Sequence, residues 1–209
     1  MKPYYGPHNG ITIYHGDCRE ILPSMERADV CFMDPPYGVG QQYGEKYSDD
    51  DRRRYESWIA ASLPSLLGCA SEVWVTPGNG NWFLWPPPSW TVCWAKPGST
   101  RRNRTGGFGE WEPVLFYGSA KIQNDLILLP DCANHASDSG DHPCPKPLRL
   151  LTALLSVREW PLVIDPFMGS GTTLRAAKDL GRRAIGIEIE ERYAEIAAKR
   201  MAQEVLPLK

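Results

Sequence analysis

Short apolar runs alternate with longer runs of helical periodicity, and this order restricts the fold more than any other feature of the sequence. The runs that we expect to be strands are Ile11–Tyr14, Ala28–Met33, Glu72–Thr76, Thr91–Ala95, Val114–Tyr117, Leu162–Ile164 and Ala184–Ile187. The runs that we expect to be helices are Arg53–Leu67, in which Pro64 introduces a kink, and Leu148–Val157, Thr172–Leu180 and Glu191–Gln203. This alternation predicts an α/β fold with a mostly parallel, twisted sheet and helices on both faces.

The length of the chain suits one large domain. We expect residues 1–209 to form it, with a loop-rich insertion at about 82–110. A hydrophobic content of 42% and a charged content of 23% are typical of soluble globular proteins. No apolar run approaches the ~20 residues that cross a bilayer. Met1–Gly10 has no signal-peptide core, so we expect a cytoplasmic protein without a membrane partner.

The charge balance does not by itself indicate a nucleic-acid partner, because the net charge is -2. Any basic surface must therefore be local. Two short clusters could supply one, Arg52-Arg53-Arg54 and Arg101-Arg102-Asn103-Arg104. Small clusters of this kind are also common on solvated surfaces, and that reading stays open.

The cysteines do not form the pattern of a disulfide framework. Four of them stand singly: Cys18, Cys31, Cys69 and Cys93. Isolated cysteines in apolar surroundings are typical of buried thiols in a reducing compartment. Cys132-x2-His135 and His142-x-Cys144 could together supply four zinc ligands. Their spacing is not a standard one, so we expect no metal site.

Acidic residues follow four of the expected strands. They are Asp17, Asp34, Asp165 and Glu188. In an open parallel sheet, ligands bind outside the carboxyl ends of the strands. We therefore expect the four acids to lie along one edge of the sheet and to form a binding site there.

The segment Asp34-Pro35-Pro36-Tyr37 has the chemistry of a pocket for a planar amine. Neither proline has an N–H group, so the segment presents only acceptors: the Asp34 carboxylate and backbone carbonyls. Tyr37 adds a flat face on which a ring can stack. Fixed acceptors beside an aromatic face suit the NH2 group of a nucleobase. The alternative from these residues alone is an Asp-Pro turn that closes a hairpin.

The segment after Asp165 has the pattern of a cofactor-binding turn. Gly169 and Gly171 allow a tight turn, and Thr172 and Thr173 suit the start of a helix whose free N–H groups face the same edge. Glu188, after the next strand, stands where a carboxylate commonly binds ribose hydroxyls. No Gly-Lys-Ser/Thr follows, and leucine stands in place of a third glycine, which argues against a P-loop and a dinucleotide fingerprint.

The ordered set of motifs closely resembles the amino-group DNA methyltransferases. The set comprises Asp-Pro-Pro-Tyr at 34–37, His-Pro-Cys-Pro-Lys-Pro at 142–147, Asp-Pro-Phe-Met-Gly-Ser-Gly-Thr-Thr at 165–173 and Gly-Ile-Glu at 186–188. The catalytic motif precedes the cofactor motif, as in the family's permuted beta class. Trp94-x-Lys96 and the segment 111–116 also resemble that family. The resemblance covers most of the chain and implies a Rossmann-like methyltransferase fold.

The resemblance implies that the cofactor is S-adenosyl-L-methionine. It places Glu188 on the ribose, Asp17 near the adenine, and Asp165 with the turn 167–171 on the methionine part, supported by Lys146. The full set of residues that it assigns to the cofactor is Asp17, Cys18, Asp34, His142, Lys146, Asp165, Pro166, Phe167, Gly169, Ser170, Gly171, Thr172, Thr173 and Glu188.

The resemblance also assigns the catalytic residues Asp34, Pro35, Pro36 and Tyr37. The target base is flipped out of the duplex, because its amino group is otherwise inaccessible. Tyr37 stacks on the base, while Asp34 and the Pro35 carbonyl accept from its amine. Holding both hydrogens favours a tetrahedral nitrogen whose lone pair can attack the methyl group.

Two features depart from the family's pattern. Cys144 stands where the family usually has threonine. The stretch between Tyr117 and His142 is too short for a full target-recognition domain. Sequence choice must then come from the loops 38–51 and 97–110, or from a specificity partner or a homodimer, or be weak. A phosphate-binding role for the arginines of the second loop, Arg101, Arg102 and Arg104, gains support from this.

We therefore expect a site-specific methyltransferase that acts on the N6 amine of adenine in double-stranded DNA. Asp34 favours adenine, because cytosine-N4 members of the family more often have serine there. The alternatives are a cytosine-N4 DNA methyltransferase, an RNA adenine methyltransferase and a non-catalytic nucleic-acid binding module. A nicotinamide dehydrogenase would leave two of the motifs unexplained. The small size suits a restriction-modification or phage enzyme.

Overall fold

The computed structural model describes residues 2–36, 42–43, 47–48, 52–99, 106–130 and 146–203. The main sheet has nine strands in the order β1-β2-β11-β10-β3-β6-β8-β7-β9. Their bounds are β1 Tyr5–His8, β2 Ile11–His15, β3 Ala28–Met33, β6 Ala70–Val75, β7 Trp90–Ala95, β8 Trp111–Tyr117, β9 Leu126–Leu128, β10 Leu162–Asp165 and β11 Arg183–Glu188. A separate pair is formed by β4 Gln42–Tyr43 and β5 Tyr47–Ser48.

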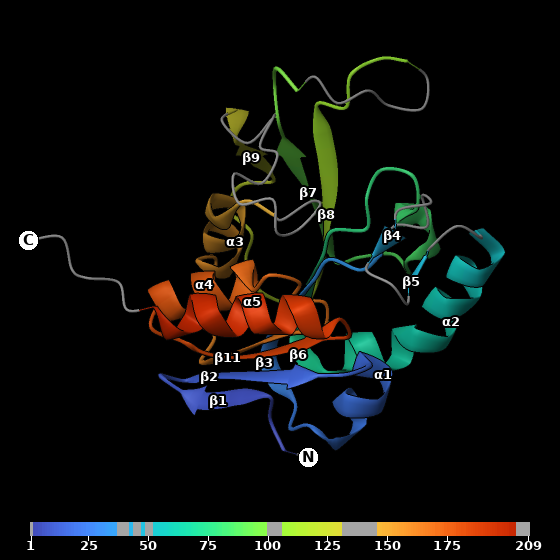
Figure 1. The fold of residues 1–209 in the computed structure, drawn as a ribbon. Coiled ribbons are helices and arrows are strands. Elements are labelled where there is room, and N and C mark those ends of the chain that lie inside the picture. Colours follow the sequence, from blue (N-terminus) through green and yellow to red (C-terminus); the bar gives the residue numbers. More distant parts are fainter. Residues whose placement is uncertain are drawn as a thin grey trace, which may run out of the picture.

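The centre of the sheet is parallel. The neighbouring strands β2, β11, β10, β3 and β6 all run in one direction. β1 and β8 lie antiparallel beside the two ends of this central group, and β7 and β9 continue the sheet beyond β8. Figure 1 shows β1 and β2 at the bottom and β7 and β8 rising at the top. The expected mostly parallel α/β sheet is confirmed.

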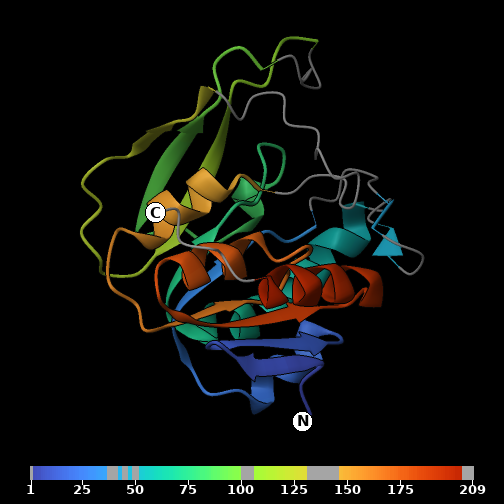
Figure 2. The same ribbon diagram turned by 60° about the vertical axis from the view of Figure 1, so that its left-hand side comes forward.

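The helices cover both faces of the sheet, as expected from the sequence (Figures 1 and 2). The bounds are α1 Cys18–Ile21, α2 Arg52–Gly68, α3 Leu148–Leu155, α4 Thr172–Asp179 and α5 Glu191–Ala202, with short 3-10 helices η1 Leu22–Ser24 and η2 Trp82–Leu84. Buried residues of α3, α4 and α5 form one apolar cluster with the sheet, and those of α1 and α2 form another on the opposite face.

Strand residues alternate between these two clusters, because successive side chains point to opposite faces. Val30 and Phe32 of β3 belong to the cluster with α3, whereas Cys31 and Met33 belong to the cluster with α2. A central strand buried on both faces accounts for the nearly continuous apolar run of β3.

Most elements agree with the sequence-based expectations to within two residues, and the differences have local causes. The expected helix around Pro64 is a single helix, α2, with the proline inside it. The carbonyl of Ala60 loses its helical partner there, but Ala60 is exposed and its carbonyl can bond to water. The sequence did not predict β1, β9 or α1, which are three to four residues long. No helix in the described ranges could traverse a bilayer.

Candidate functional site

Five parallel strands end at one edge of the sheet, and each is followed by, or ends in, a polar residue. In the order of the strands across the sheet these are Asp17, Glu188, Asp165, Asp34 and Thr76. We call this edge the carboxyl-end rim. The expectation that the four acids lie along one edge of the sheet is therefore confirmed.

Proline directly follows the last polar residue of three adjacent strands, β10, β3 and β6. The dipeptides are Asp165-Pro166, Asp34-Pro35 and Thr76-Pro77. Because a residue before proline is restricted to extended conformations, each strand keeps its direction to its last side chain. The prolines also remove N–H donors from the rim.

Both oxygens of the Asp34 carboxylate accept hydrogen bonds. The Thr76 hydroxyl donates to Oδ1 at 2.7 Å, and the Lys146 ammonium donates to Oδ2 at 2.6 Å. The Lys146 side chain is only 9% exposed and that of Asp34 is 23% exposed, so this ion pair is largely shielded from water.

Strand geometry explains why these three groups meet. Phe32 and Trp74 lie in the apolar cluster that contains α3, and they pair across β3 and β6. Asp34 and Thr76 come two residues later, so their side chains point to the same face. Lys146 lies two residues before the start of α3, which packs on that face.

Asp165 is a buried acid, 2% exposed, at the end of β10. The pKa of its carboxyl is raised to about 7, mainly by burial and also by the charges of Asp34 and Glu188. Hydrogen bonds from Thr173 and from the Phe167 N–H (2.9 Å) oppose this rise. The hydrogen bonds to the Asp165 carboxylate therefore do not compensate for the cost of burying its charge.

Glu188 at the end of β11 is in a similar state, at 8% exposure. One oxygen accepts from the Gly169 N–H at 2.9 Å and the other from the Glu190 N–H at 2.9 Å. Burial nevertheless raises the pKa of the Glu188 carboxyl to about 7 against these bonds, and the charge of Glu190 acts in the same direction as burial. Glu190 Oε1 is itself buried and has no hydrogen-bond partner within the described residues.

The turn between β10 and α4 folds back onto β11. The Met168 N–H donates to the Ile187 carbonyl at 3.1 Å. A Cβ atom on Gly186 would lie 2.3 Å from the Met168 sulfur, so only glycine permits this contact. Gly169 and Gly171 have φ values of 53° and 82°, in the left-handed region that favours glycine.

Asp17 and Cys18 open α1. The Asp17 carboxylate caps the helix by accepting from the Arg19 N–H at 2.9 Å, and it also pairs with the Arg19 guanidinium. The Arg19 side chain lowers the pKa of the Asp17 carboxyl, although partial burial opposes this. The Cys18 thiol is buried in the apolar cluster, and desolvation raises its pKa to about 12.

The remaining expected residues fall into two groups. Those that the structure describes at the rim are Pro35, Pro36, Pro166, Phe167, Ser170, Thr172 and Thr173. Among them, Phe167 packs edge-to-face against Trp58 of α2, with ring centroids 5.7 Å apart. Those that lie outside the described residues are Tyr37, His142, Arg101, Arg102 and Arg104, and the hypothetical zinc ligands Cys132, His135 and Cys144. The described residues contain no cluster of metal-ligating side chains.

Sequence reasoning missed Thr76 and assigned Lys146 to the cofactor alone. Thr76 lies at the end of the strand next to Asp34, and a polar residue before proline was the available signal. Lys146 is 112 positions from Asp34, so only the fold could reveal their ion pair.

The rim fits a ligand that carries positive charge and hydroxyl groups. Asp165 and Glu188 are buried carboxyls whose pKa values are raised, and Asp34 adds a third carboxyl nearby. A cation would offset this accumulation of negative charge, and hydroxyl donors would satisfy the acceptors left open at Glu188 and Glu190. The left-handed turn at 169–171 also lets backbone N–H groups approach a ligand closely.

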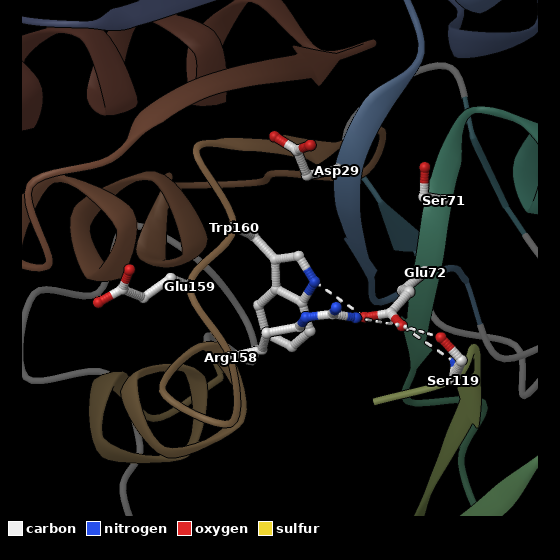
Figure 3. A pocket seen from close by; sticks show the side chains of 7 residues that line it. All are labelled: Asp29, Ser71, Glu72, Ser119, Arg158, Glu159 and Trp160. Carbon is white, nitrogen blue, oxygen red and sulfur yellow. Dashed lines mark hydrogen bonds and ion pairs between the residues drawn. The ribbon is translucent and has the colours of Figure 1, made fainter. Parts of the chain in front are cut away.

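A cavity of about 320 Å³ lies at the opposite ends of the same strands (Figure 3). Asp29 of β3 and Glu72 of β6 line it near the start of their strands, and Ser119, Arg158 and Trp160 complete it. The Glu72 carboxylate accepts from the Ser119 N–H, the Ser119 hydroxyl, Arg158 and the Trp160 indole at 2.9–3.2 Å. The Glu72 carboxylate thus has its hydrogen-bond donors within the protein. We therefore place the functional site at the rim and not at this cavity.

Comparison with known proteins finds similarity along most of the chain. Residues 70–199 match the model of the N6/N4 methyltransferase family, described as DNA methylase. The matched segment contains Thr76, Lys146, Asp165 and Glu188 of the rim. The type II methyltransferase M2.MboI of Moraxella bovis is 25% identical to this chain, in an alignment that covers 100% of the chain and 93% of the relative. For the type II methyltransferase M2.DpnII of Streptococcus pneumoniae the identity is 26%, over 97% of this chain and 93% of the relative.

Solved structures are similar along nearly the whole chain. A crystal structure of M1.HpyAVI in complex with SAM has a TM-score of 0.62 and 25% identity, and the match covers 92% of this chain and 100% of that chain. The cytosine-N4-specific PvuII DNA methyltransferase has a TM-score of 0.73 at 17% identity, over 99% of this chain and 91% of that chain, which shows the shared fold.

Proposed function

The chain belongs to the N6/N4 DNA methylase family and uses S-adenosyl-L-methionine, and on that premise we propose that it methylates the N6 amine of adenine at specific sites in double-stranded DNA. The observation that carries the proposal is the Asp34 carboxylate, the first residue of Asp-Pro-Pro, fixed at the rim by Thr76 and Lys146. A fixed acceptor beside three rim acids suits an amine that gains positive charge as it reacts.

The cofactor supplies a methyl group made electrophilic by a sulfonium cation. Glu188 would accept from its ribose hydroxyls, and Asp165 with the turn 166–171 would hold its methionine part. Asp17 would lie near its adenine, and Cys18, with a buried thiol, would contribute backbone only. The raised pKa values of Asp165 and Glu188 support these roles, because a cationic, hydroxyl-bearing ligand stabilises their charged forms.

Asp34 and the Pro35 carbonyl would accept the two hydrogens of the target amine. The nitrogen lone pair of a nucleobase amine is delocalised into the ring, and two acceptors favour the tetrahedral geometry that localises it. Methylation leaves a positive charge and an excess proton on the nitrogen. The Asp34 carboxylate would stabilise that charge and would receive the proton.

Adenine is favoured over cytosine because position 34 is aspartate. The cytosine-N4 specificity of the PvuII enzyme does not weaken this preference, since 17% identity carries the fold alone. The names of the type II relatives do not state the base. The choice of base is thus the first result that an experiment should give.

DNA would be held by the loops that follow β6 and β7 at the rim. Trp82 and Phe83 follow β6, and Phe108 and Trp111 close the loop after β7; all four side chains are 46–57% exposed. The Asn79 side chain donates to the Trp111 carbonyl at 2.7 Å, so the two loops lie side by side. Exposed aromatic rings can stack on bases, which supports a DNA-facing surface.

The arginines 101, 102 and 104 in the second loop would bind phosphates. Each Arg→Ala change should weaken binding of all DNA sequences alike. It should also lower the slope of log affinity against log salt by about one, since one fewer counterion is released. A triple alanine variant with unchanged affinity and slope would exclude the role.

Target choice would need these loops or a second subunit. The alignment with M2.MboI has 261 positions whereas this chain has 209 residues, so the relative contains segments with no counterpart here. This supports the proposal that residues 1–209 form a single catalytic domain without a full target-recognition domain. Size-exclusion chromatography with and without DNA would test for a homodimer.

Transfer of labelled methyl groups onto DNA and RNA, followed by nucleoside analysis, tests the function directly. We expect label in N6-methyladenine from double-stranded DNA. Label in N4-methylcytosine would reassign the base, and label in RNA alone would reassign the substrate. Binding of DNA without any transfer would indicate a non-catalytic binding module. A reaction in a strong chelator should proceed at an unchanged rate, because no step requires a metal.

The free thiols Cys18, Cys31, Cys69 and Cys93 support the proposal that the protein acts in the cytoplasm.

A further inference from the structure

Thr76 has a buried hydroxyl that takes no direct part in the proposed methyl and proton transfers. It is 0% exposed at the end of β6, and its N–H donates to the Met33 carbonyl at 3.0 Å. This bond continues the pairing of β6 with β3 one step beyond Val75 and Met33. The backbone of Thr76 is therefore fixed beside the backbone of Asp34.

Among the residues that the structure describes, the hydroxyl proton of Thr76 has one favourable acceptor. Asp34 Oδ1 lies at 2.7 Å, whereas the Met33 carbonyl oxygen lies at 3.5 Å. A hydroxyl has only one proton to donate, so the shorter contact determines its orientation. The bond to the carboxylate is charge-assisted, and the strand residues that precede its two partners, Met33 and Val75, are 0% exposed.

The hydroxyl and Lys146 hold opposite oxygens of the same carboxylate. The Lys146 ammonium is at the end of a long side chain from a separate segment of the protein, whereas the backbone of Thr76 is held by the sheet. One contact on each oxygen fixes both the position and the plane of the carboxylate. With Thr76 removed, the carboxylate would be free to turn toward the lysine.

We propose that Thr76 is a positioning residue for methyl transfer, which fixes the Asp34 carboxylate so that Oδ1 faces the amine of the target base. The proposal rests on the proposed function of Asp34. Thr76 itself touches neither the base nor the cofactor in this scheme. Its loss should therefore reduce kcat and leave both affinities almost unchanged.

The test uses Thr76→Val, which keeps the shape and removes the donor, and Thr76→Ser, which keeps the donor. Thr12→Val in β2 is the matched control. For Thr76→Val we expect kcat to fall at least tenfold, in line with the loss of one hydrogen bond to a charged group. The KM for DNA and the Kd of S-adenosylmethionine should stay within threefold. Thr76→Ser and Thr12→Val should keep kcat within threefold of the wild type.

Three results would overturn the proposal. They are a Thr76→Val variant with less than a fivefold loss of kcat, a Thr76→Ser variant that loses as much as valine, and a Thr76→Val variant whose cofactor affinity falls more than tenfold. The last two would assign Thr76 a packing role.

A crystal structure of Thr76→Val supplies a readout that does not depend on activity. We expect the Asp34 carboxylate to have turned away from position 76, and an unmoved carboxylate would contradict the proposal. The failure of the proposed function is distinguishable, because it would appear in the wild type. If the wild type methylates cytosine, the proposed base is wrong, and the Thr76 variants are then assayed on cytosine.

Discussion

The two ends of the parallel strands carry buried acids in opposite electrostatic states. At the amino end, the residue Glu72 is 4% exposed, and burial alone would raise the pKa of its carboxyl. Bonds from Ser119 and Trp160 and the charge of Arg158 outweigh burial, so the pKa of Glu72 lies below its usual value. At the rim, burial raises the pKa values of Asp165 and Glu188 to about 7.

The difference lies in the supply of donors, since both ends are desolvated. Glu72 receives two side-chain N–H bonds, a hydroxyl bond and a backbone N–H bond, which tie β6 to the end of β8 and to the segment before β10 (Figure 3). Asp165 and Glu188 end two neighbouring strands of the rim and receive mainly backbone N–H bonds, from Phe167, Gly169 and Glu190. A site whose charges are not balanced internally is suited to a cationic ligand, whereas a balanced one contributes to the fold.

The largest expected effect separates chemistry at the rim from structure at the amino end. Asp34→Ala should reduce methyl transfer by about a thousandfold or more, as the loss of a preorganised group at the reacting atom commonly does. The Kd of S-adenosylmethionine should stay within about tenfold, or ~1.4 kcal/mol, by calorimetric titration.

The control for Asp34→Ala is Asp29→Asn at the other end of β3. Asp29 accepts from the Leu162 N–H at 2.8 Å, and asparagine keeps an acceptor there. Its methylation rate should match the wild type. An Asp34→Ala variant that binds no cofactor would contradict the division of roles at the rim.

At Glu72 we expect a loss of stability without a loss of activity. In Glu72→Gln the negative charge is lost, and the new NH2 group faces the N–H and O–H donors that bond to the carboxylate. We therefore expect the free energy of unfolding to fall by about 2–4 kcal/mol. Methyl transfer per folded molecule should change less than twofold. Urea denaturation measures the free energy of unfolding, and the rate at saturating substrates measures methyl transfer. The control is Ser71→Ala, at an exposed position of the same strand. A large loss of rate in a stably folded variant would argue that this end also serves catalysis.

The rim acids should make the ligand-free protein less stable as pH rises. The pKa of Glu188 is raised from 4.5 to about 7 on folding, so between these values the folded state binds more protons than the unfolded state. Stability therefore falls from about pH 4.5 to pH 7, by at most about 3 kcal/mol for this group. The contribution of Glu72 has the opposite sign, since its lowered pKa gives stability that is lost on acidification.

Denaturation curves of the wild type and Glu188→Gln at pH 5, 6, 7 and 8 would measure the effect. The variant should lose relatively less stability as pH rises through this range. Parallel curves would show that Glu188 already has the donors that it needs.

The smallest expected effect is that of Arg158→Ala. The Arg158 side chain is 56% exposed while its partner Glu72 is 5% exposed, so solvent screens the pair from one side. We expect a loss of less than about 1 kcal/mol in the free energy of unfolding, decreasing further in high salt. A loss equal to that of Glu72→Gln would mean that the ion pair, rather than the uncharged donors, stabilises this end.

Much of the fold and of the site could be predicted from local patterns. The apolar runs located the central strands, and proline or glycine marked where they end. Acids at four strand ends predicted a single rim, because parallel strands must present their carboxyl ends together. The short elements β1, β9 and α1 were missed because three or four residues give too little periodicity to recognise.

The sequence by itself determined the chemistry of this protein: which acids follow which strands, where the glycine turn lies, and that Asp34 is followed by two prolines. Only the tertiary structure decided how those groups are charged and held. The ion pair of Lys146 with Asp34 and the bond from Thr76 join positions 112 and 42 residues apart. The raised pKa of Asp165 likewise arises from burial and from Asp34 and Glu188 on neighbouring strands, and that of Glu188 arises mainly from burial. Such properties depend on distance and solvent exclusion, which no local pattern of residues encodes.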